Sequence, residues 1–331
     1  MLQEQAPARP ILAYRGIGEG SQYQWQGALA TVRVSPRDSV FSEFSLTDFE
    51  IPAGNNVDLM ACRAVDRLYY CTGGRGEITL DGQAHHIEDG SFVFCGRGRA
   101  LSVHAADGQV LQLLNASFPP GPESRFDLLA DKAQDRLPDA ATCAALELLT
   151  QIEAEALPES QRGPTFVLAA GEGPSYWQAA PSVGEVTVKL TPAMAPVYNI
   201  AAGIQLLEPG ALVREHGHRR GIECVVAVQG SASVQIDGVE QDFSKGAVCV
   251  AGPYAMHSFR NTGNEPFILF SCGTPGGAEL ALAETGVLHV PGQPRPAEMP
   301  RNAQTGRILV ERYGFVLPSN AADNPETAAK G

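Results

Sequence analysis

The sequence predicts an all-β protein built from two tandem β-barrel domains. The chain has 331 residues, of which 44% are hydrophobic, and this is enough apolar mass for two separate cores. It also contains 35 glycines and 24 prolines, and proline is disfavoured inside helices, so strands and turns should dominate. An internal repeat is the third observation, and it indicates that the two halves share one fold.

The repeat is visible when residues 51–82 are placed over residues 207–238 without a gap. The coinciding pairs are Gly54 with Gly210, Gly74 with Gly230, Asp81 with Asp237, and Gly82 with Gly238. Glycine serves where the backbone needs a positive φ, so matched glycines indicate matched turns. Asp-Gly between two alternating apolar runs favours a hairpin in each half.

Each half contains short runs rich in Val, Ile, Phe and Tyr that are bounded by turn residues, which is typical of strands. The expected strands are residues 28–34, 41–46, 66–72, 76–80 and 91–95 in the first half, and 185–190, 203–208, 223–229, 232–236, 247–251 and 266–272 in the second. Some runs alternate, and others are apolar on both faces. Burial on both faces favours a barrel wall packed on another layer, such as the partner barrel or a second subunit.

The expected domains are an N-terminal barrel over residues 1–118 and a C-terminal barrel over residues 166–290. Residues 119–165 form the connector between them, because good helix formers with helical spacing run from Asp139 to Ala156. The Pro-rich, polar residues 291–331 are expected to be a C-terminal extension.

The net charge of −13 disfavours nucleic acid and anionic membranes as partners, because both need a basic face. The seven cysteines have irregular spacings without a CxxC pair, which favours buried, reduced thiols. The beginning of the chain lacks a signal-peptide pattern, and no apolar run approaches the ~18 residues of a membrane span. We therefore expect a cytoplasmic protein.

A constellation of potential metal ligands lies in the second half. His216 and His218 are two positions apart, so a strand places both imidazoles on one face. A short turn ending at Gly221 would bring Glu223 opposite them, and His257 would come from another strand. Three imidazoles and a carboxylate suit one divalent transition metal, with Fe, Mn or Ni ahead of Cu, Co or Zn. Four protein ligands leave coordination positions open, as catalytic metal sites require.

These residues resemble the two motifs of the cupin superfamily. The first motif is matched at every spacing by Gly210, His216, His218, Glu223 and Gly230, and the second by Gly246, His257 and Asn261. Gly252 and Tyr254 stand where the second motif has a proline and a glycine. The resemblance implies two cupin barrels of the double-stranded β-helix, or jelly-roll, type. A lone buried histidine is usually an ordinary core residue, but four ligand-type residues at these spacings favour a metal site.

The first half offers a comparison within the same chain. The repeat places Met60, Cys62, Arg67 and Leu101 at the four ligand positions. Arg67 would add a positive charge, and Leu101 offers no ligand atom. We therefore expect one metal ion per chain, held in the second barrel only.

Two cupin halves with a helical connector resemble the bicupin quercetin 2,3-dioxygenases, and residues 166–177 are similar to the segment that opens their second half. The resemblance implies a metal-dependent dioxygenase that uses O2 to cleave a C–C bond of an aromatic, flavonol-like or enolisable small molecule. It assigns Glu223 the additional role of catalytic base, a task for which burial should raise its pKa. It also implies a homodimer.

Candidate substrate contacts lie on neighbouring positions. Val225 has the strand parity of Glu223, Phe259 has that of His257, and Tyr254 and Met256 lie on the approach to His257. Ordinary barrel core is the alternative role for these four. Arg214 and Arg260 could hold an anionic substrate, with salt bridges at the barrel rim as the alternative.

Two other functions remain open. A non-oxidative cupin metalloenzyme, such as an isomerase, lyase or aminohydrolase, would use the same ligands. A non-enzymatic small-molecule-binding bicupin would use the same barrel. Substrate-dependent oxygen uptake separates the dioxygenase from both.

Overall fold

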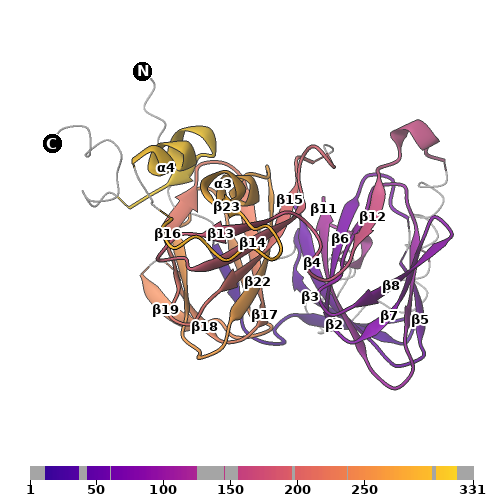
Figure 1. Ribbon diagram of the computed structural model, residues 1–331. Helices are drawn as coiled ribbons and strands as arrows, with labels where there is room; N and C mark the ends of the chain where they lie inside the picture. The colour runs from indigo at the N-terminus through magenta and orange to yellow at the C-terminus, as the bar shows by residue number, and fades with distance from the viewer. Residues whose placement is uncertain are drawn as a thin grey trace. The chain divides into compact units, whose positions relative to one another are not determined.

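A computed structural model of the chain describes residues 12–36, 43–59, 61–124, 145, 156–195, 198–236, 238–299 and 303–318. The chain divides into two compact units. Residues 19–172 form the N-terminal unit, and residues 1–18 together with 173–331 form the C-terminal unit. Both are built from antiparallel sheets with few helices, so the predicted all-β fold of two tandem cupin barrels is confirmed (Figure 1).

In the N-terminal unit, one sheet of seven strands has the order β12-β9-β6-β11-β4-β3-β2, and a sheet of four has the order β5-β10-β7-β8. The strands are β2 (Ser21–Trp25), β3 (Ala28–Val34), β4 (Ser45–Ile51), β5 (Asn56–Leu59), β6 (Asp66–Gly73), β7 (Arg75–Leu80), β8 (Gln83–Glu88), β9 (Phe92–Cys95), β10 (Leu101–Ala105), β11 (Leu111–Phe118) and β12 (Thr165–Leu168). A 3-10 turn, η2 (Glu159–Gln161), precedes β12.

In the C-terminal unit, one sheet of eight strands has the order β1-β20-β17-β22-β15-β14-β13-β23, and a sheet of five has the order β19-β18-β21-β16-β24. The strands are β1 (Leu12–Arg15), β13 (Ser175–Gln178), β14 (Gly184–Leu190), β15 (Ala201–Leu207), β16 (Leu212–His218), β17 (Ile222–Gln229), β18 (Ala232–Ile236), β19 (Val239–Asp242), β20 (Val248–Ala251), β21 (His257–Asn261), β22 (Phe267–Thr274), β23 (Val287–Leu288) and β24 (Phe315–Val316). The helical segments are α3 (Ala278–Thr285), α4 (Ala303–Arg307) and the π-helical η3 (Ile308–Arg312).

The two units repeat one strand order, as the matched glycines predict. In the large sheets β6 lies between β9 and β11, and β17 lies between β20 and β22. The register also corresponds. Arg67 pairs with Cys95 in the first unit, and Glu223 pairs with Ala251 in the second. Arg67 therefore occupies the position of Glu223, as the repeat predicts.

The strand pairing differs from the expected domain boundaries of 1–118, 119–165, 166–290 and 291–331. β1 pairs with β20 and so belongs to the C-terminal unit, whereas β12 pairs with β9 in the N-terminal unit. β24, from the expected extension, pairs with β16. Local patterning does not reveal which strands pair, so the boundaries expected from the sequence do not follow the strand pairing. The predicted connector helix over 139–156 lies outside the described residues, apart from residues 145 and 156.

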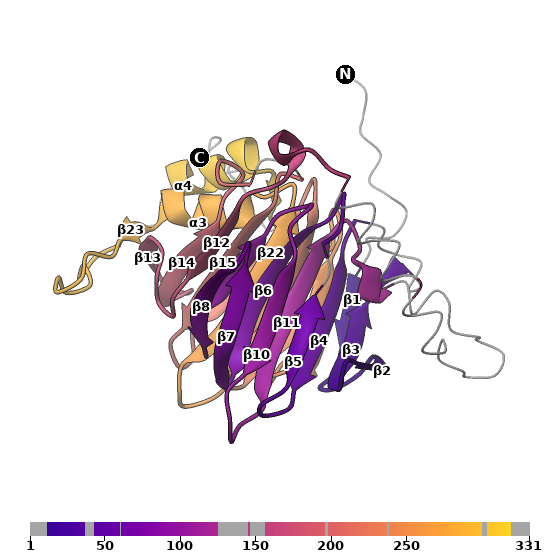
Figure 2. The same cartoon turned by 90° about the vertical axis from the view of Figure 1, so that its right-hand side faces the viewer.

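The core of the C-terminal unit explains where a polar site can lie. Glu223, Val225 and Ala227 share one face of β17, because side chains alternate along a strand. Val225 and Ala227 belong to the apolar cluster, together with Phe259 and Leu269. Glu223 continues the same column beyond this cluster. In Figures 1 and 2, α3 and α4 lie at one end of the strands of this unit.

The expectations about the cysteines and about membrane spans can be compared with the described residues. Six of the seven cysteines fall within them, and all six are buried and outside any disulfide bond. None of the described helices has the length and apolar character that crossing a bilayer requires.

The pairing of β1 with β20 gives a prediction about stability. Tyr14 packs against the C-terminal core, and its hydroxyl donates a hydrogen bond to the Asp242 carbonyl at 2.6 Å. Tyr14→Ala should lower the free energy of unfolding by about 1–3 kcal/mol, because it removes buried ring surface. Tyr14→Phe is the matched control and should cost about 1 kcal/mol, since only the hydrogen bond is lost. Chemical denaturation measures both, and an unchanged midpoint for Tyr14→Ala would contradict the pairing.

Candidate metal centre

The four predicted ligands come from three strands of the C-terminal unit. His216 and His218 lie on β16, and His257 begins β21 directly opposite His216 in the antiparallel register. Gly221, with φ of 91°, lies in the turn that leads from β16 in one sheet to β17 in the other. This crossing places Glu223 on the wall that faces the histidines.

The ligand atoms of His216, His218, Glu223 and His257 all lie within 4.8 Å of one another. One carboxylate oxygen, Oε2 of Glu223, is 3.0 Å from Nε2 of His218 and 3.0 Å from Nε2 of His257. His216 and His257 are also largely buried, and His257 is fully so. The sequence motif therefore corresponds to a compact cluster in space.

Backbone carbonyls orient two of the imidazoles. Nδ1 of His216 is 2.9 Å from the Arg214 carbonyl, and Nδ1 of His257 is 3.0 Å from the Ala255 carbonyl. A hydrogen bond from Nδ1 fixes the tautomer that leaves Nε2 for an ion. This is the arrangement that metal-binding histidines adopt, so the donor set fits a divalent transition metal.

The electrostatics of the cluster follow from burial and from the neighbouring charges. Burial, reinforced by His257 and His218, lowers the pKa of His216 to about 3, which keeps this imidazole neutral as a ligand must be. Burial alone would raise the pKa of Glu223, but the charge and hydrogen bond of His218, together with His257, hold that pKa well below its usual range. The expected upward shift at Glu223 is therefore wrong, because the histidines outweigh desolvation.

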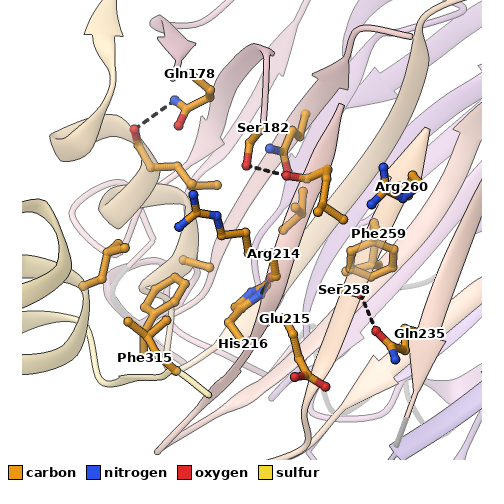
Figure 3. A pocket seen from close by; sticks show the side chains of 18 of the residues that line it. Gln178, Ser182, Arg214, Glu215, His216, Gln235, Ser258, Phe259, Arg260 and Phe315 are labelled. Atoms are coloured by element: carbon orange, nitrogen blue, oxygen red, sulfur yellow. Dashed lines mark hydrogen bonds between the residues drawn. The ribbon is translucent and has the colours of Figure 1, made fainter. Parts of the chain in front are cut away.

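A cavity of about 1090 Å³ opens beside the cluster, and His216 and Glu223 form part of its wall. Four of the six predicted substrate contacts line it: Val225, Phe259, Arg214 and Arg260 (Figure 3).

Tyr254 and Met256 do not line this cavity. Tyr254 lies in the turn before β21 with φ of 64°, and its N–H donates to the His218 carbonyl. The positive φ explains why the cupin motif has a glycine at this position. Met256 alternates with His257 along the chain, and its sulfur packs near Gly217 instead.

Phe315 and Glu215 are two of the cavity-wall residues that the sequence did not point to. Phe315 of β24 stacks on His216 with ring centroids 5.3 Å apart and meets His218 edge-on at 4.8 Å. Glu215 also lines the cavity, because the register shifts between Val213 and His216 and breaks regular alternation. Figure 3 shows Glu215 pointing away from the direction taken by Arg214.

The equivalent positions of the N-terminal unit do not form such a cluster. Cys62, Arg67 and Leu101 are buried, and Met60 lies outside the described residues. The Arg67 guanidinium donates to the Arg99 carbonyl at 2.7 Å. Within the described ranges, the histidine and glutamate cluster of the C-terminal unit is the single group of this kind.

Comparisons with known proteins agree with this geometry. The family model described as "Cupin domain" matches residues 203–273. This range includes all four cluster residues, on β16, β17 and β21. Protein SchB of Streptomyces halstedii is 31% identical over 91 residues, which cover 27% of this chain and 66% of that protein.

Solved structures of similar fold cover most of the chain. The formate complex of oxalate decarboxylase from Lactobacillus farciminis has a TM-score of 0.54 at 18% identity, over 79% of this chain and 85% of that chain. Procruciferin, an 11S globulin from Brassica napus, has a TM-score of 0.58 at 12% identity, over 79% and 84%. The Cupin domain match assigns residues 203–273 to a cupin domain, and with the repeated strand order these likenesses show the fold of a bicupin.

Proposed function

We propose that this bicupin is a metalloenzyme that holds one divalent transition metal ion per chain on His216, His218, Glu223 and His257. The observation that carries the proposal is the convergence of three imidazoles and a carboxylate on the wall of a large cavity. When bound, the ion would supply Lewis-acid polarisation and a template for the substrate. Fe, Mn and Ni are the favoured ions for this donor set, ahead of Cu, Co and Zn.

The residues around the cluster have separate tasks in this proposal. The carbonyls of Arg214 and Ala255 hold two imidazoles in fixed orientations. The Glu223 carboxylate borders the cavity and can take a proton from a substrate hydroxyl or enol. Phe315 stacks on the face of His216 and contacts His218 edge-on, and in this proposal it keeps water from that side of the cluster.

The cavity lining favours a small molecule with both an apolar part and polar oxygens. Val225, Leu269, Phe259 and Phe315 supply apolar surface. The polar surface comes from neutral hydrogen-bonding side chains, two arginines and, besides Glu223, two further glutamates: Gln178, Ser182, Gln205, Ser233, Gln235, Ser258, Ser271, Arg214, Arg260, Glu215 and Glu240. An aromatic or enolisable substrate with hydroxyl or carboxylate groups meets both demands.

The reaction that we propose is cleavage of a C–C bond of such a substrate with O2, a dioxygenase reaction. The support is the resemblance to the bicupin quercetin 2,3-dioxygenases together with a single ligand cluster whose cavity accepts a small molecule. Tyr254 and Met256 have no part in substrate binding in this proposal, because the cavity does not reach them. A homodimer is proposed on the same resemblance.

A non-oxidative metalloenzyme is the second candidate. The likeness to oxalate decarboxylase favours it, although that likeness is one of fold. The same ligands would serve a lyase, an isomerase or an aminohydrolase, so the cluster alone does not separate these reactions.

Metal content is the first prediction of this proposal. Purified protein reconstituted with a divalent ion and desalted should retain about one ion per chain in elemental analysis. His257→Ala should lose most of it, because removal of one ligand leaves Glu223 and two imidazoles. His104→Ala, an exposed histidine of the N-terminal unit, is the control and should retain the ion. Retention of about two ions per chain would contradict a site restricted to the second barrel.

Oxygen uptake is the second prediction. Metal-loaded protein should consume O2 in an oxygen electrode when given a flavonol, another catechol-like phenol or an enolisable diketone. Glu223→Gln should reduce the rate by about 100-fold or more, since loss of a positioned base alone has that effect. Turnover of a substrate without oxygen uptake would reject the dioxygenase and leave the non-oxidative candidate.

A further inference from the structure

A buried acidic side chain beside the metal centre has no task in the proposed reaction. Glu279 is the second residue of α3 and is 2% exposed. Its Oε1 accepts a hydrogen bond from the Ser271 hydroxyl at 2.8 Å. Ser271 lies on β22 opposite Val225, and both line the cavity. Glu279 is therefore tied to the cavity wall through Ser271.

The packing of Glu279 depends on a glycine in a neighbouring strand. Gly203 pairs with Ser271, and a Cβ at this glycine would lie only 3.0 Å from Cγ of Glu279. A second, much smaller cavity of about 30 Å³ is bordered by Glu279 together with the ligands Glu223 and His218. Such a volume holds about one water molecule. Glu279 is thus close to the ligands without being one of them.

The N-terminal unit repeats this glutamate. Glu123 follows β11 at the same distance as Glu279 follows β22. It is 4% exposed and accepts a hydrogen bond from the Ser117 hydroxyl at 3.0 Å. Each barrel therefore contains a buried glutamate that is bound by a serine of its last long strand.

The charged residue next to this glutamate is a cation in one unit and an anion in the other. Arg67 stands at the ligand position of the N-terminal unit, and its guanidinium attracts Glu123. Glu223 stands there in the C-terminal unit, and its carboxylate repels Glu279. Burial and then this repulsion raise the pKa of Glu279 to about 7. The first barrel thus contains its own cation, whereas the second brings two carboxyl groups together.

We propose that Glu279 is a positioning residue that adds a second negative charge to the metal centre and so strengthens its hold on a divalent cation, without binding the ion itself. The inference rests on the proposed metal site. Two carboxylates beside three imidazoles, which bind an ion as neutral ligands, match the charge of one divalent cation, in the way that Arg67 matches Glu123 in the other unit. Carboxyl groups outside the ligand set commonly support metal binding by this means.

The test uses Mn²⁺ alone as the probe and the full chain freed of metal. Binding is measured by EPR of free Mn²⁺ at about pH 8, above the pKa of Glu279, where its carboxyl is ionised. Glu279→Gln preserves the acceptor for Ser271 but removes the charge, so its Kd should rise about tenfold. Glu123→Gln is the matched control and should leave the Kd unchanged.

Thermal unfolding of the metal-free variants distinguishes the effect of losing a charge from the effect of disturbed packing. Glu279→Gln relieves repulsion from Glu223, so its unfolding temperature should equal or exceed that of the parent. Glu123→Gln loses attraction to Arg67 and should unfold earlier. A Kd for Glu279→Gln equal to the parent's would overturn the inference, as would an equal loss of affinity in both variants.

Glu279→Asp retains the charge and provides an answer even if the Gln variant does not fold. A Kd within about threefold of the parent's supports a charge effect, and a tenfold loss would overturn it. The proposed site and the inference fail in different ways. If the parent does not bind Mn²⁺ or the other ions of its donor set, the metal site is rejected. If the parent binds and Glu279→Gln binds equally well, only the role of Glu279 is rejected.

Discussion

The shared carboxylate oxygen of Glu223 is the contact on which the rest of the C-terminal unit depends. Burying three imidazoles and a carboxylate in a barrel is costly unless each polar atom finds a partner. Here one oxygen meets Nε2 of His218 and of His257, and backbone carbonyls meet Nδ1 of His216 and of His257. Strands of both sheets therefore hold the polar cluster in place. The cluster lies at the edge of the apolar core.

The two units show how one barrel can carry opposite electrostatics. Strand order and register are the same, so the backbone does not require a metal. The difference lies in side chains at equivalent positions: Arg67 and Leu101 in one unit, Glu223 and His257 in the other. The Arg67 guanidinium attracts the buried Glu123, whereas Glu223 repels the buried Glu279, so equivalent carboxyl groups have opposite electrostatic surroundings in the two units.

The sequence was most informative where local spacing determines geometry. Three features predicted the four cluster residues and the duplicated fold: the HxH spacing on a strand, the glycine turn and the repeat. These features depend on residues close in the chain or on a gapless alignment. The base role of Glu223 was expected to need a raised pKa, but the direction depends on how near His218 and His257 lie, which spacing does not reveal. Tyr254 and Met256 were misplaced because a positive φ and the alternation before His257 turn them away from the cavity. Glu279 could have been found by extending the repeat to Glu123.

Two segments outside the ligand motifs bring side chains to the site, and this explains why those residues were missed. α3 contributes Glu279, and β24 brings Phe315 onto His216 and His218. Long-range pairing of short strands leaves little trace in local patterning. Binding residues on segments carried by a rigid scaffold can change without disturbing the core. The strands of the barrel therefore account for the histidine and glutamate cluster, while α3 and β24 add further residues around it.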